Sequence, residues 1–200
     1  MHRKTTLRAA AFVAVASILS GCASYSVKPM PTLNPTAAAN HAEKANLYIA
    51  AKAFRTAHEC RAVFSDNLTG GGYIPVEVSL ENMGRAPLIL YRQNFELTTS
   101  HGEILSATAP EVVAEHFSNS IVGGALLTGV FGVAAAEHAN HKRDAAFQSK
   151  GLDKTIPLAN GQVVNGFLYF KGKMDKTLPA HLRVTFTHNE KSETITLPVG

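Results

Sequence analysis

Short segments in which apolar and polar residues alternate constrain this fold more than any other feature of the sequence. The clearest is YIPVEVSLEN, residues 73–82, whose apolar side chains fall at every second position from Ile74 to Leu80. A repeat of two residues places successive side chains on opposite faces of a β-strand. The same alternation returns in NFELTTS and in HLRVTFTH. We therefore expect a fold that is mainly β.

Turn residues separate these segments at short intervals. Asn160-Gly161 lies between KTIPL and QVVNGFLYF, and Asn-Gly is the strongest short hairpin signal. A polar turn from Asn189 to Lys191 would join HLRVTFTH to TITLPV as a second hairpin. Repeated short strands with such turns predict an antiparallel β-sandwich of about 7–8 strands.

The predicted strands are interrupted by an insertion at about residues 108–151 that carries helix signals. Thr108 and Glu111 have capping-box spacing, and Lys150 precedes Gly151 as at a helix C-terminus. One helix of this length is unusual in a globular domain, so we expect a helical hairpin. Gly123-Gly124 and Asn140 are the expected breaks.

The insertion contains an apolar run, Ile121–Ala136, with small residues at every fourth position. A helix of these 16 residues would be about 24 Å long against a hydrocarbon core of about 30 Å, which disfavours a full membrane span. The small side chains would let another helix approach closely; they are Gly124, Thr128, Gly132 and Ala136. Three interpretations stay open: packing within the domain, which we favour, then association with a protein partner or a second copy, then insertion into a bilayer.

The N-terminus has the organisation of a signal peptide over residues 1–21. MHRKTTLR is positively charged, and AAAFVAVASIL is apolar but too short to cross a bilayer. The apolar stretch ends in Leu19-Ser20-Gly21-Cys22. This tetrapeptide resembles the lipobox of bacterial lipoproteins. The resemblance implies cleavage before Cys22, a diacylglyceryl thioether on its sulfur and an acyl chain such as palmitate on the new amine.

The same resemblance implies a location. The residue after the cysteine is Ala23 rather than aspartate, which favours the outer membrane with the protein facing the periplasm; another lipid-anchored place in the envelope is the alternative. Three prolines within residues 23–40 predict an extended, flexible tether. The expected organisation is therefore a signal peptide at 1–21, a lipidated cysteine and tether at 22–45, and a β-sandwich domain with its insertion at 46–200.

A second resemblance concerns the domain. The pattern YIPVEVSLENMGRAPLIL followed later by GFLYF is similar to that of immunoglobulin-like periplasmic lipoprotein domains. It implies an immunoglobulin-like sandwich, and no activity follows from so general a likeness.

The net charge of +4 does not indicate a nucleic-acid partner. Arg3, Lys4 and Arg8 of the signal peptide supply three of the 19 Lys and Arg residues, which leaves 16 against 15 Asp and Glu. No basic stripe with interleaved aromatic residues remains.

Motifs with catalytic chemistry are missing from the sequence. It contains no G-x-S-x-G nucleophile elbow, no H-E-x-x-H and no phosphate loop. Cys60 has no disulfide partner once Cys22 carries lipid, and we expect it to be a buried, unreactive thiol. His138 and His141 could hold a metal weakly from one helix face, but no third strong ligand is evident, so a solvated helix end is favoured. We predict no cofactor and no enzymatic activity.

These observations together predict a non-catalytic, membrane-anchored envelope lipoprotein that binds or scaffolds a partner. Its expected partners are the lipid bilayer, through acylated Cys22, and an envelope protein. The alternative is a protein that forms homo-oligomers or perturbs membranes through the small-residue helix at 120–136. A histidine-based metal-binding protein is the least favoured interpretation.

Overall fold

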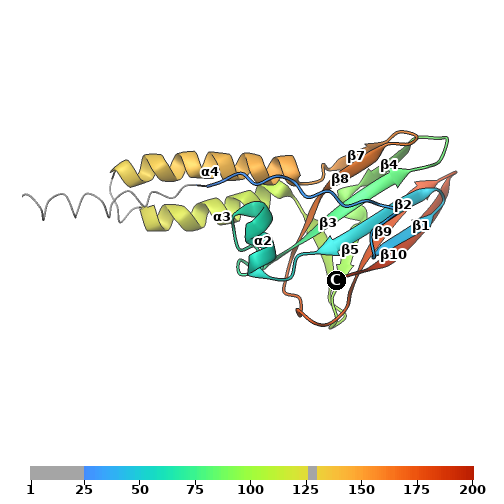
Figure 1. The fold of residues 1–200 in the computed structure, drawn as a ribbon, viewed down its shortest axis with the longest axis horizontal. Helices are drawn as coiled ribbons and strands as arrows, with labels where there is room; N and C mark the ends of the chain where they lie inside the picture. Colours follow the sequence, from blue (N-terminus) through green and yellow to red (C-terminus); the bar gives the residue numbers. More distant parts are fainter. Residues whose placement is uncertain (1–24, 126–129) are drawn as a thin grey trace, which may run out of the picture.

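A computed structural model describes residues 25–125 and 130–200, and within these it describes the side chains of residues 25–118 and 137–200 (Figure 1). The fold is mainly β and antiparallel, as predicted. The strands in chain order are β1 His41–Lys44, β2 Leu47–Ala53, β3 Tyr73–Asn82, β4 Leu88–Tyr91, β5 Phe95–Thr98, β6 Ile104–Thr108, β7 Thr155–Leu158, β8 Val163–Lys171, β9 Ala180–His188 and β10 Lys191–Val199. The helices are α2 Ala57–Phe64, the 3₁₀ turn η1 Arg92–Asn94, α3 Pro110–Ala125 and α4 Val130–Lys150.

Eight of these strands form one sheet in the order β1-β2-β3-β8-β6-β5-β9-β10, and β4 pairs with β7 in a small second sheet. The large sheet curls until its two edges approach each other. Lys44 Nζ on β1 lies 3.0 Å from Glu193 Oε2 on β10 and donates to the carbonyl oxygen of Thr194 at 3.3 Å. The sheet is therefore nearly closed into a barrel.

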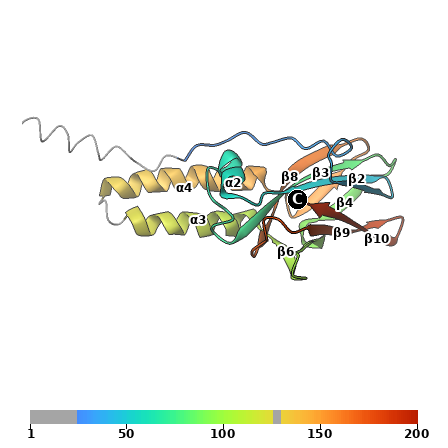
Figure 2. The same ribbon diagram turned by 60° about the horizontal axis from the view of Figure 1, so that its bottom comes forward.

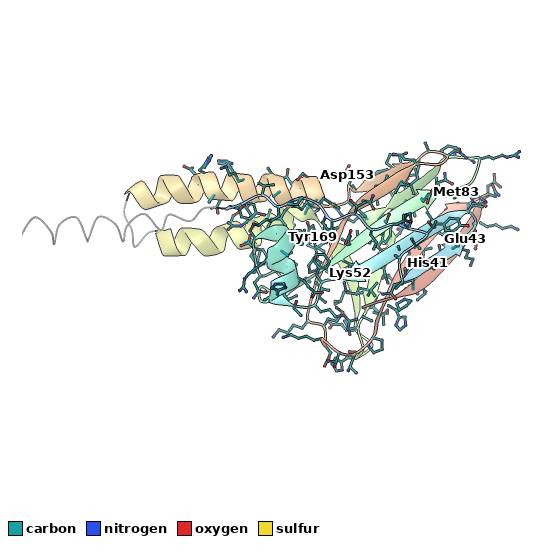
Figure 3. The ribbon with its side chains drawn as sticks, viewed as in Figure 1. His41, Glu43, Lys52, Met83, Asp153 and Tyr169 are labelled. Carbon is teal, nitrogen blue, oxygen red and sulfur yellow. The ribbon has the colours of Figure 1, made fainter. Side chains whose placement is uncertain are left out.

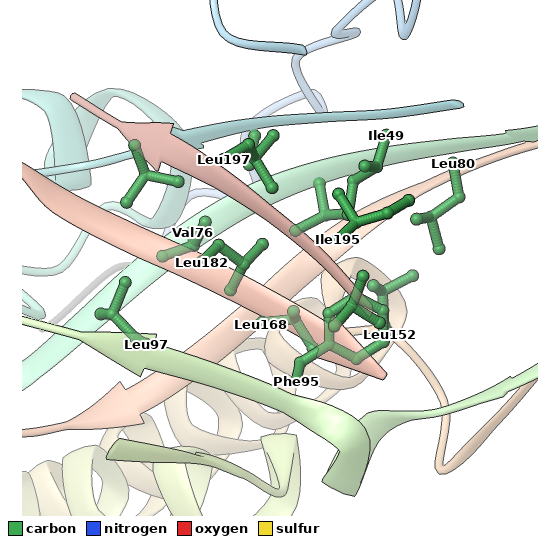
Figure 4. Packing of buried hydrophobic residues seen from close by; sticks show 14 of the residues in the cluster. Ile49, Val76, Leu80, Phe95, Leu97, Leu152, Leu168, Leu182, Ile195 and Leu197 are labelled. Carbon is green, nitrogen blue, oxygen red and sulfur yellow. The ribbon is translucent and has the colours of Figure 1, made fainter. Parts of the chain in front are cut away.

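The inner face of this sheet holds an aliphatic core, and the alternating pattern predicted its members on β3. Ile74, Val76, Val78 and Leu80 are all at most 2% exposed. Figure 4 shows how side chains from β2, β8, β9 and β10 meet Val76 and Leu80 across the interior. Full burial of one such side chain stabilises the fold by about 1.5–3 kcal/mol, so the inner core is the main source of stability for the sheet.

The outer face of the sheet is covered at one end by the helices. A second cluster forms there, which we call the outer aromatic cluster. Phe64 from α2 lies 4.8 Å from Phe167 and 5.5 Å from Phe147, measured between ring centroids. Tyr169 of β8 lies between helices and sheet (Figure 3) and donates from its hydroxyl to the Phe147 carbonyl oxygen at 3.3 Å. This cluster fastens α2 and α4 to the sheet.

Helix α2 begins and ends where its sequence specifies. Thr56 caps the N-terminus by accepting from the Glu59 N–H, and the Glu59 carboxylate accepts from the Thr56 N–H in return. This capping box satisfies two backbone donors that would otherwise lack partners. Ser65 ends the helix in the left-handed conformation, with φ of 60°, so α2 is confined to eight residues.

Helices α3 and α4 lie side by side and extend away from one end of the sheet (Figures 1 and 2). The break expected at Gly123-Gly124 is not found there, because α3 continues through both glycines to Ala125, and α4 begins at Val130. The expected break at Asn140 is wrong, because α4 continues through it. The Asn140 amide donates to the Ser118 carbonyl oxygen of α3 at 3.4 Å, and its Oδ1 accepts from Arg143 Nη1 at 2.8 Å. These tertiary partners offset the low helix propensity of asparagine.

One of the two predicted hairpins is correct. Strands β9 and β10 pair antiparallel across Asn189 and Glu190, both at positive φ, as expected from the polar turn. The hairpin predicted at Asn160-Gly161 is wrong, because β7 pairs with β4 while β8 pairs with β3. The turn does form, with Gly161 at φ of 67°, but its ends enter different sheets. A local turn signal does not determine which strands pair.

Candidate functional site

Residues 25–40, the segment predicted to be a tether, lie along the outer face of the domain; we call them the N-terminal strap. Figures 1 and 2 show the strap running beside α4 and then across the sheet. The backbone carbonyl of Ser26 accepts from Ser65 Oγ at 2.6 Å, Met30 packs against the outer aromatic cluster, and Pro35 is buried. The Asn40 amide donates to the Gly200 carbonyl oxygen at 3.0 Å. The strap is followed directly by β1, five residues before the predicted start of the domain.

The first residue of the strap, Tyr25, is fixed to α4 by a buried cation. The Arg143 guanidinium carbon lies 5.1 Å from the centroid of the Tyr25 ring. The Nε of Arg143 also lies 2.7 Å from Asp66 Oδ2 in the segment after α2. Burial, followed by the nearby Asp66 charge, raises the pKa of the Tyr25 hydroxyl. Arg143 thus links the strap, α4 and the α2 region at one point, which we call the strap latch.

Under the middle of the strap, the outer face of β3 is polar but buried. Glu77 is 3% exposed and Ser79 is fully buried. The backbone N–H of Leu33 in the strap donates to the Glu77 carboxylate. Among the described residues, Glu77 Oε1, Ser79 Oγ and Asn165 Oδ1 have no hydrogen-bond partner. Burial raises the pKa of Glu77, and the charge of Lys52 on the neighbouring strand opposes that rise. The strap therefore covers groups that free sheet surface would expose to water.

A cavity of about 320 Å³ lies where the start of α2 meets the turn at 67–72 and the loop at 172–178. Its walls include the aromatic side chains of Phe54 and Tyr73, and three cations contribute to its lining: Arg55, Lys173 and Lys176. None of the site residues predicted from the sequence lines this cavity. Its aromatic and cationic character makes it a candidate ligand site.

The sequence-derived candidates fall elsewhere. Cys22 and Thr128 lie outside the described residues. Gly124 belongs to α3, and Gly132 and Ala136 to α4, but the described side chains do not extend to these positions. The prediction of a close-packing row is therefore untested.

His138 and His141 lie exposed on α4. Within the described part of the chain, no three His, Cys, Asp or Glu side chains are grouped so that they could hold a metal ion. Across the same residues, no helix combines the length and apolar character needed to cross a bilayer.

Cys60 is fully buried in the outer aromatic cluster, as predicted. Burial raises the pKa of its thiol, and hydrogen bonds from the backbone of Thr69 and Leu68 oppose that rise in part. A thiol held protonated and away from solvent is a weak nucleophile.

The residues that define the strap latch and the cavity were not found from the sequence. Tyr25, Arg143 and Arg55 stand alone among unrelated neighbours, and nothing in their spacing marks them. One signal was present. Tyr25 is the single Phe, Trp or Tyr residue within the predicted tether at 22–45, and a large aromatic ring is unusual in a free polar tether.

Comparisons with known proteins give no family. No family model matches the chain, and no curated protein matches it. Among solved structures, the chain is similar to the crystal structure of the yjhA protein from Bacillus subtilis, with 9% identity, a TM-score of 0.39, and coverage of 78% of this chain and 94% of that chain. A similarity at this level identifies neither a family nor a function.

Proposed function

We propose that the chain is a non-catalytic, lipid-anchored envelope protein that presents its β domain to a binding partner. The lipobox at Leu19-Ser20-Gly21-Cys22 supports the anchor. The structural observation that supports this arrangement is that the N-terminal strap packs against the domain. Only Ala23 and Ser24 lie between Cys22 and Tyr25, which is held on α4 by Arg143. The three steps from Cys22 to Tyr25, at about 3.5 Å per extended residue, reach about 10 Å.

A domain anchored through so short a free segment stays beside the lipid leaflet. Because Tyr25 contacts α4 at Ala139 and Ala146, the acyl chains would enter the membrane next to the helical hairpin. The proposed location is the outer membrane, facing the periplasm, with another lipid-anchored envelope site as the alternative. We further propose that the curled sheet is a variant of the immunoglobulin-like sandwich, in which the halves of one sheet face each other across the inner core.

Mass spectrometry of the protein purified from envelope membranes tests the anchor. The expected N-terminal peptide begins at Cys22 and carries the mass of a diacylglyceryl group and one further acyl chain. A Cys22→Ala variant should lose both the modification and the membrane association. A native peptide that begins at another residue, or that carries an unmodified Cys22 thiol, would refute the proposal.

Crosslinking in intact cells tests the binding role. A photoreactive residue placed at exposed positions of the sheet, such as Tyr91 or Ile104, should capture one defined envelope protein, and Cys22→Ala should abolish the capture by removing the protein from its membrane. The same partner should be captured from one photoreactive position and not from the others. Capture of no protein from any position in the anchored chain would count against a scaffolding role.

A second candidate is self-association or membrane perturbation through residues 120–136. It is favoured by the direction of α3 and α4, which carry this segment away from the sheet (Figures 1 and 2). Gly124→Leu with Gly132→Leu should break an assembly seen by sedimentation in detergent, while the exposed control Ala145→Leu leaves it intact. A native protein that sediments as a monomer at all concentrations excludes self-association.

The metal-binding interpretation is the third. His138 and His141 are both exposed on α4, so a metal would be held by two imidazoles and solvent, which is a weak site. Metal analysis of the purified protein, before and after His138→Ala with His141→Ala, measures it directly. Retained zinc or copper that disappears in the double variant would support this interpretation over the other two.

A further inference from the structure

The cavity beside α2 has the size and walls of a small-molecule site. Its volume of about 320 Å³ lies at the lower end of the range for ligand pockets, which begins near 300 Å³. Phe54 and Tyr73 are both buried and held in place by rings behind them. Phe54 lies edge-on to Phe167 at 5.2 Å, and Tyr73 lies edge-on to His116 at 5.3 Å. The aromatic wall is therefore fixed in position.

The charged part of the lining is cationic. Arg55, Lys173 and Lys176 contribute to it, and none of the described residues that line the cavity is an Asp or Glu. Arg55 donates to three backbone carbonyl oxygens, those of Lys176, Leu178 and Val199. Carbonyl oxygens hold a guanidinium in place and carry no formal charge that would offset it.

The two carboxylates nearest in sequence to these cations are already engaged. Asp175 Oδ1 accepts from the Thr177 N–H, the Thr177 hydroxyl and the Leu178 N–H, and the bonds to Thr177 lower its pKa. Glu59 Oε2 accepts from the N–H groups of Arg55 and Thr56. Burial raises the pKa of Glu59, but these hydrogen bonds outweigh it and leave the pKa below its usual value. Both carboxylates keep their negative charge, but their oxygens accept from local backbone, and among the described residues neither forms an ion pair with Arg55, Lys173 or Lys176.

We propose that this cavity binds a small ligand that carries an anionic group, a carboxylate or a phosphate, on an aromatic or other flat apolar body. The apolar body packs on Phe54 and Tyr73, and the anion lies between Arg55 and the two lysines. Lys52, labelled in Figure 3, stands 5.5 Å from the centroid of the Phe54 ring, but it lies outside the cavity lining and its charge acts on the carboxylates of Glu59 and Glu77. This binding activity is independent of the lipid at Cys22 and goes beyond the anchoring role.

Equilibrium dialysis with matched probes tests the proposal on the full-length protein in nonionic detergent, against detergent alone. Phenyl phosphate, benzoate, benzyl alcohol and benzylamine share a ring and differ in charge, and inorganic phosphate supplies the anion without the ring. Phenyl phosphate should bind about tenfold more tightly than benzyl alcohol, as expected for two or three partly exposed charge contacts. Benzylamine and inorganic phosphate should bind more weakly than phenyl phosphate.

Two kinds of variant separate charge from shape. Lys173→Gln with Lys176→Gln should weaken phenyl phosphate about fivefold to tenfold and leave benzyl alcohol unchanged. The matched control, Lys154→Gln with Lys191→Gln, removes two exposed lysines outside the cavity lining and should have no effect. Ala57→Phe, at a position that lines the cavity, should fill it and reduce binding of every probe that carries a ring.

The outcomes decide the proposal. Preference for the anionic ring, lost in the cavity variants and kept in the control pair, supports it. Equal binding of benzylamine and phenyl phosphate, equal effects of the two lysine pairs, or no binding of any probe in the millimolar range overturns it. Far-UV circular dichroism of each variant shows that the sheet is intact, so that a loss of binding is not a loss of folding.

Discussion

The two faces of β3 are buried to nearly the same degree by different means. On the inner face, Ile74 to Leu80 pack into an aliphatic core made by the curled sheet itself. On the outer face, Tyr73 lies under α3, and Glu77 lies under the strap. The inner cover comes from strands that the alternating pattern specifies, and the outer cover comes from helices and strap that reach the sheet from distant parts of the chain.

The difference teaches that alternation identifies which residues share a face but not whether that face meets water. A polar face is normally solvated in an antiparallel sheet. Here Glu77 and Ser79 are as buried as the apolar residues between them. Buried polar groups without partners lower stability by about 1–3 kcal/mol each, so the outer cover has to be held by strong contacts elsewhere. The outer aromatic cluster and the strap latch provide them.

The largest effect is expected from Phe64→Ala, which removes the central ring of the outer aromatic cluster. Phe64 is fully buried and contacts Phe147, Phe167 and Tyr169. The free energy of unfolding should fall by about 3–5 kcal/mol, as for other buried phenylalanines. Urea denaturation of the purified protein, followed by circular dichroism, measures it.

Phe95→Ala on the inner face is the matched comparison, because Phe95 is also fully buried. Equal losses would show that the two faces are both true cores. The exposed Val112→Ala on α3 should change stability by less than about 0.5 kcal/mol. A loss below about 1 kcal/mol for Phe64→Ala would mean that the outer cover contributes little.

The next effect is expected from Arg143→Met, which breaks the strap latch. Arg143 is buried, whereas the side chain of Asp66 is 19% exposed, so water partly solvates the carboxylate that is left behind. We expect a loss of about 2–3 kcal/mol, below the usual 3–5 kcal/mol for a fully buried pair. Hydrogen exchange in residues 25–40 should rise at the same time.

The exposed pair between Arg183 and Glu96 supplies the control. Arg183→Met should cost less than about 1 kcal/mol and leave exchange in the strap unchanged. If Arg143→Met destabilises the protein without any change in strap exchange, the latch holds α4 to the α2 region and not the strap.

The inner face was predictable from the sequence because its signal is local. The repeat in YIPVEVSLEN fixed both the bounds of β3 and its buried residues, and the turn at Asn189 predicted the β9–β10 hairpin. The pairing of β7 with β4 was not predictable, since strand partners depend on contacts between residues far apart in the chain.

The outer cover could not be predicted for the same reason. The segment 29–35 is rich in proline, as free tethers are, and composition alone does not show that a segment packs against a surface. The contacts that hold the strap come from Ser65, Glu77 and Arg143, separated by dozens of residues. The cavity beside α2 could not be predicted either, because Arg55 and Lys176 are far apart in the chain and come together only in the folded structure.

A smaller effect is expected from pH, through Glu77. Burial raises its folded-state pKa above the unfolded value of about 4.3. The folded state therefore binds the proton more tightly, so this contribution to stability is present below the unfolded pKa and is lost as pH rises through the folded pKa. Glu77→Gln should remove this dependence and stabilise the protein at pH 7 by about 1 kcal/mol.

Urea denaturation at pH 5 and pH 7 measures the effect. The native protein should lose stability between these values relative to Glu77→Gln. Glu81→Gln, on the same face of β3 and only half-buried, is the control and should follow the native protein within about 0.5 kcal/mol. Parallel curves for the native protein and Glu77→Gln would show that water reaches the carboxylate beneath the strap.

The smallest effect is expected at the seam where β1 meets β10. Lys44 and Glu193 form an ion pair at 3.0 Å, with side chains 49% and 25% exposed. An exposed pair contributes about 0.2–1 kcal/mol and weakens with salt, so Lys44→Gln should lower the free energy of unfolding by about 0.5 kcal/mol in low salt and by less in high salt. Val199 on the same edge is buried in the inner core, which supplies a larger stabilisation than the ion pair. A loss above about 1.5 kcal/mol would mean that the edge contact, rather than the apolar interior, keeps the sheet curled, and the inner face would then depend on its cover as the outer face does.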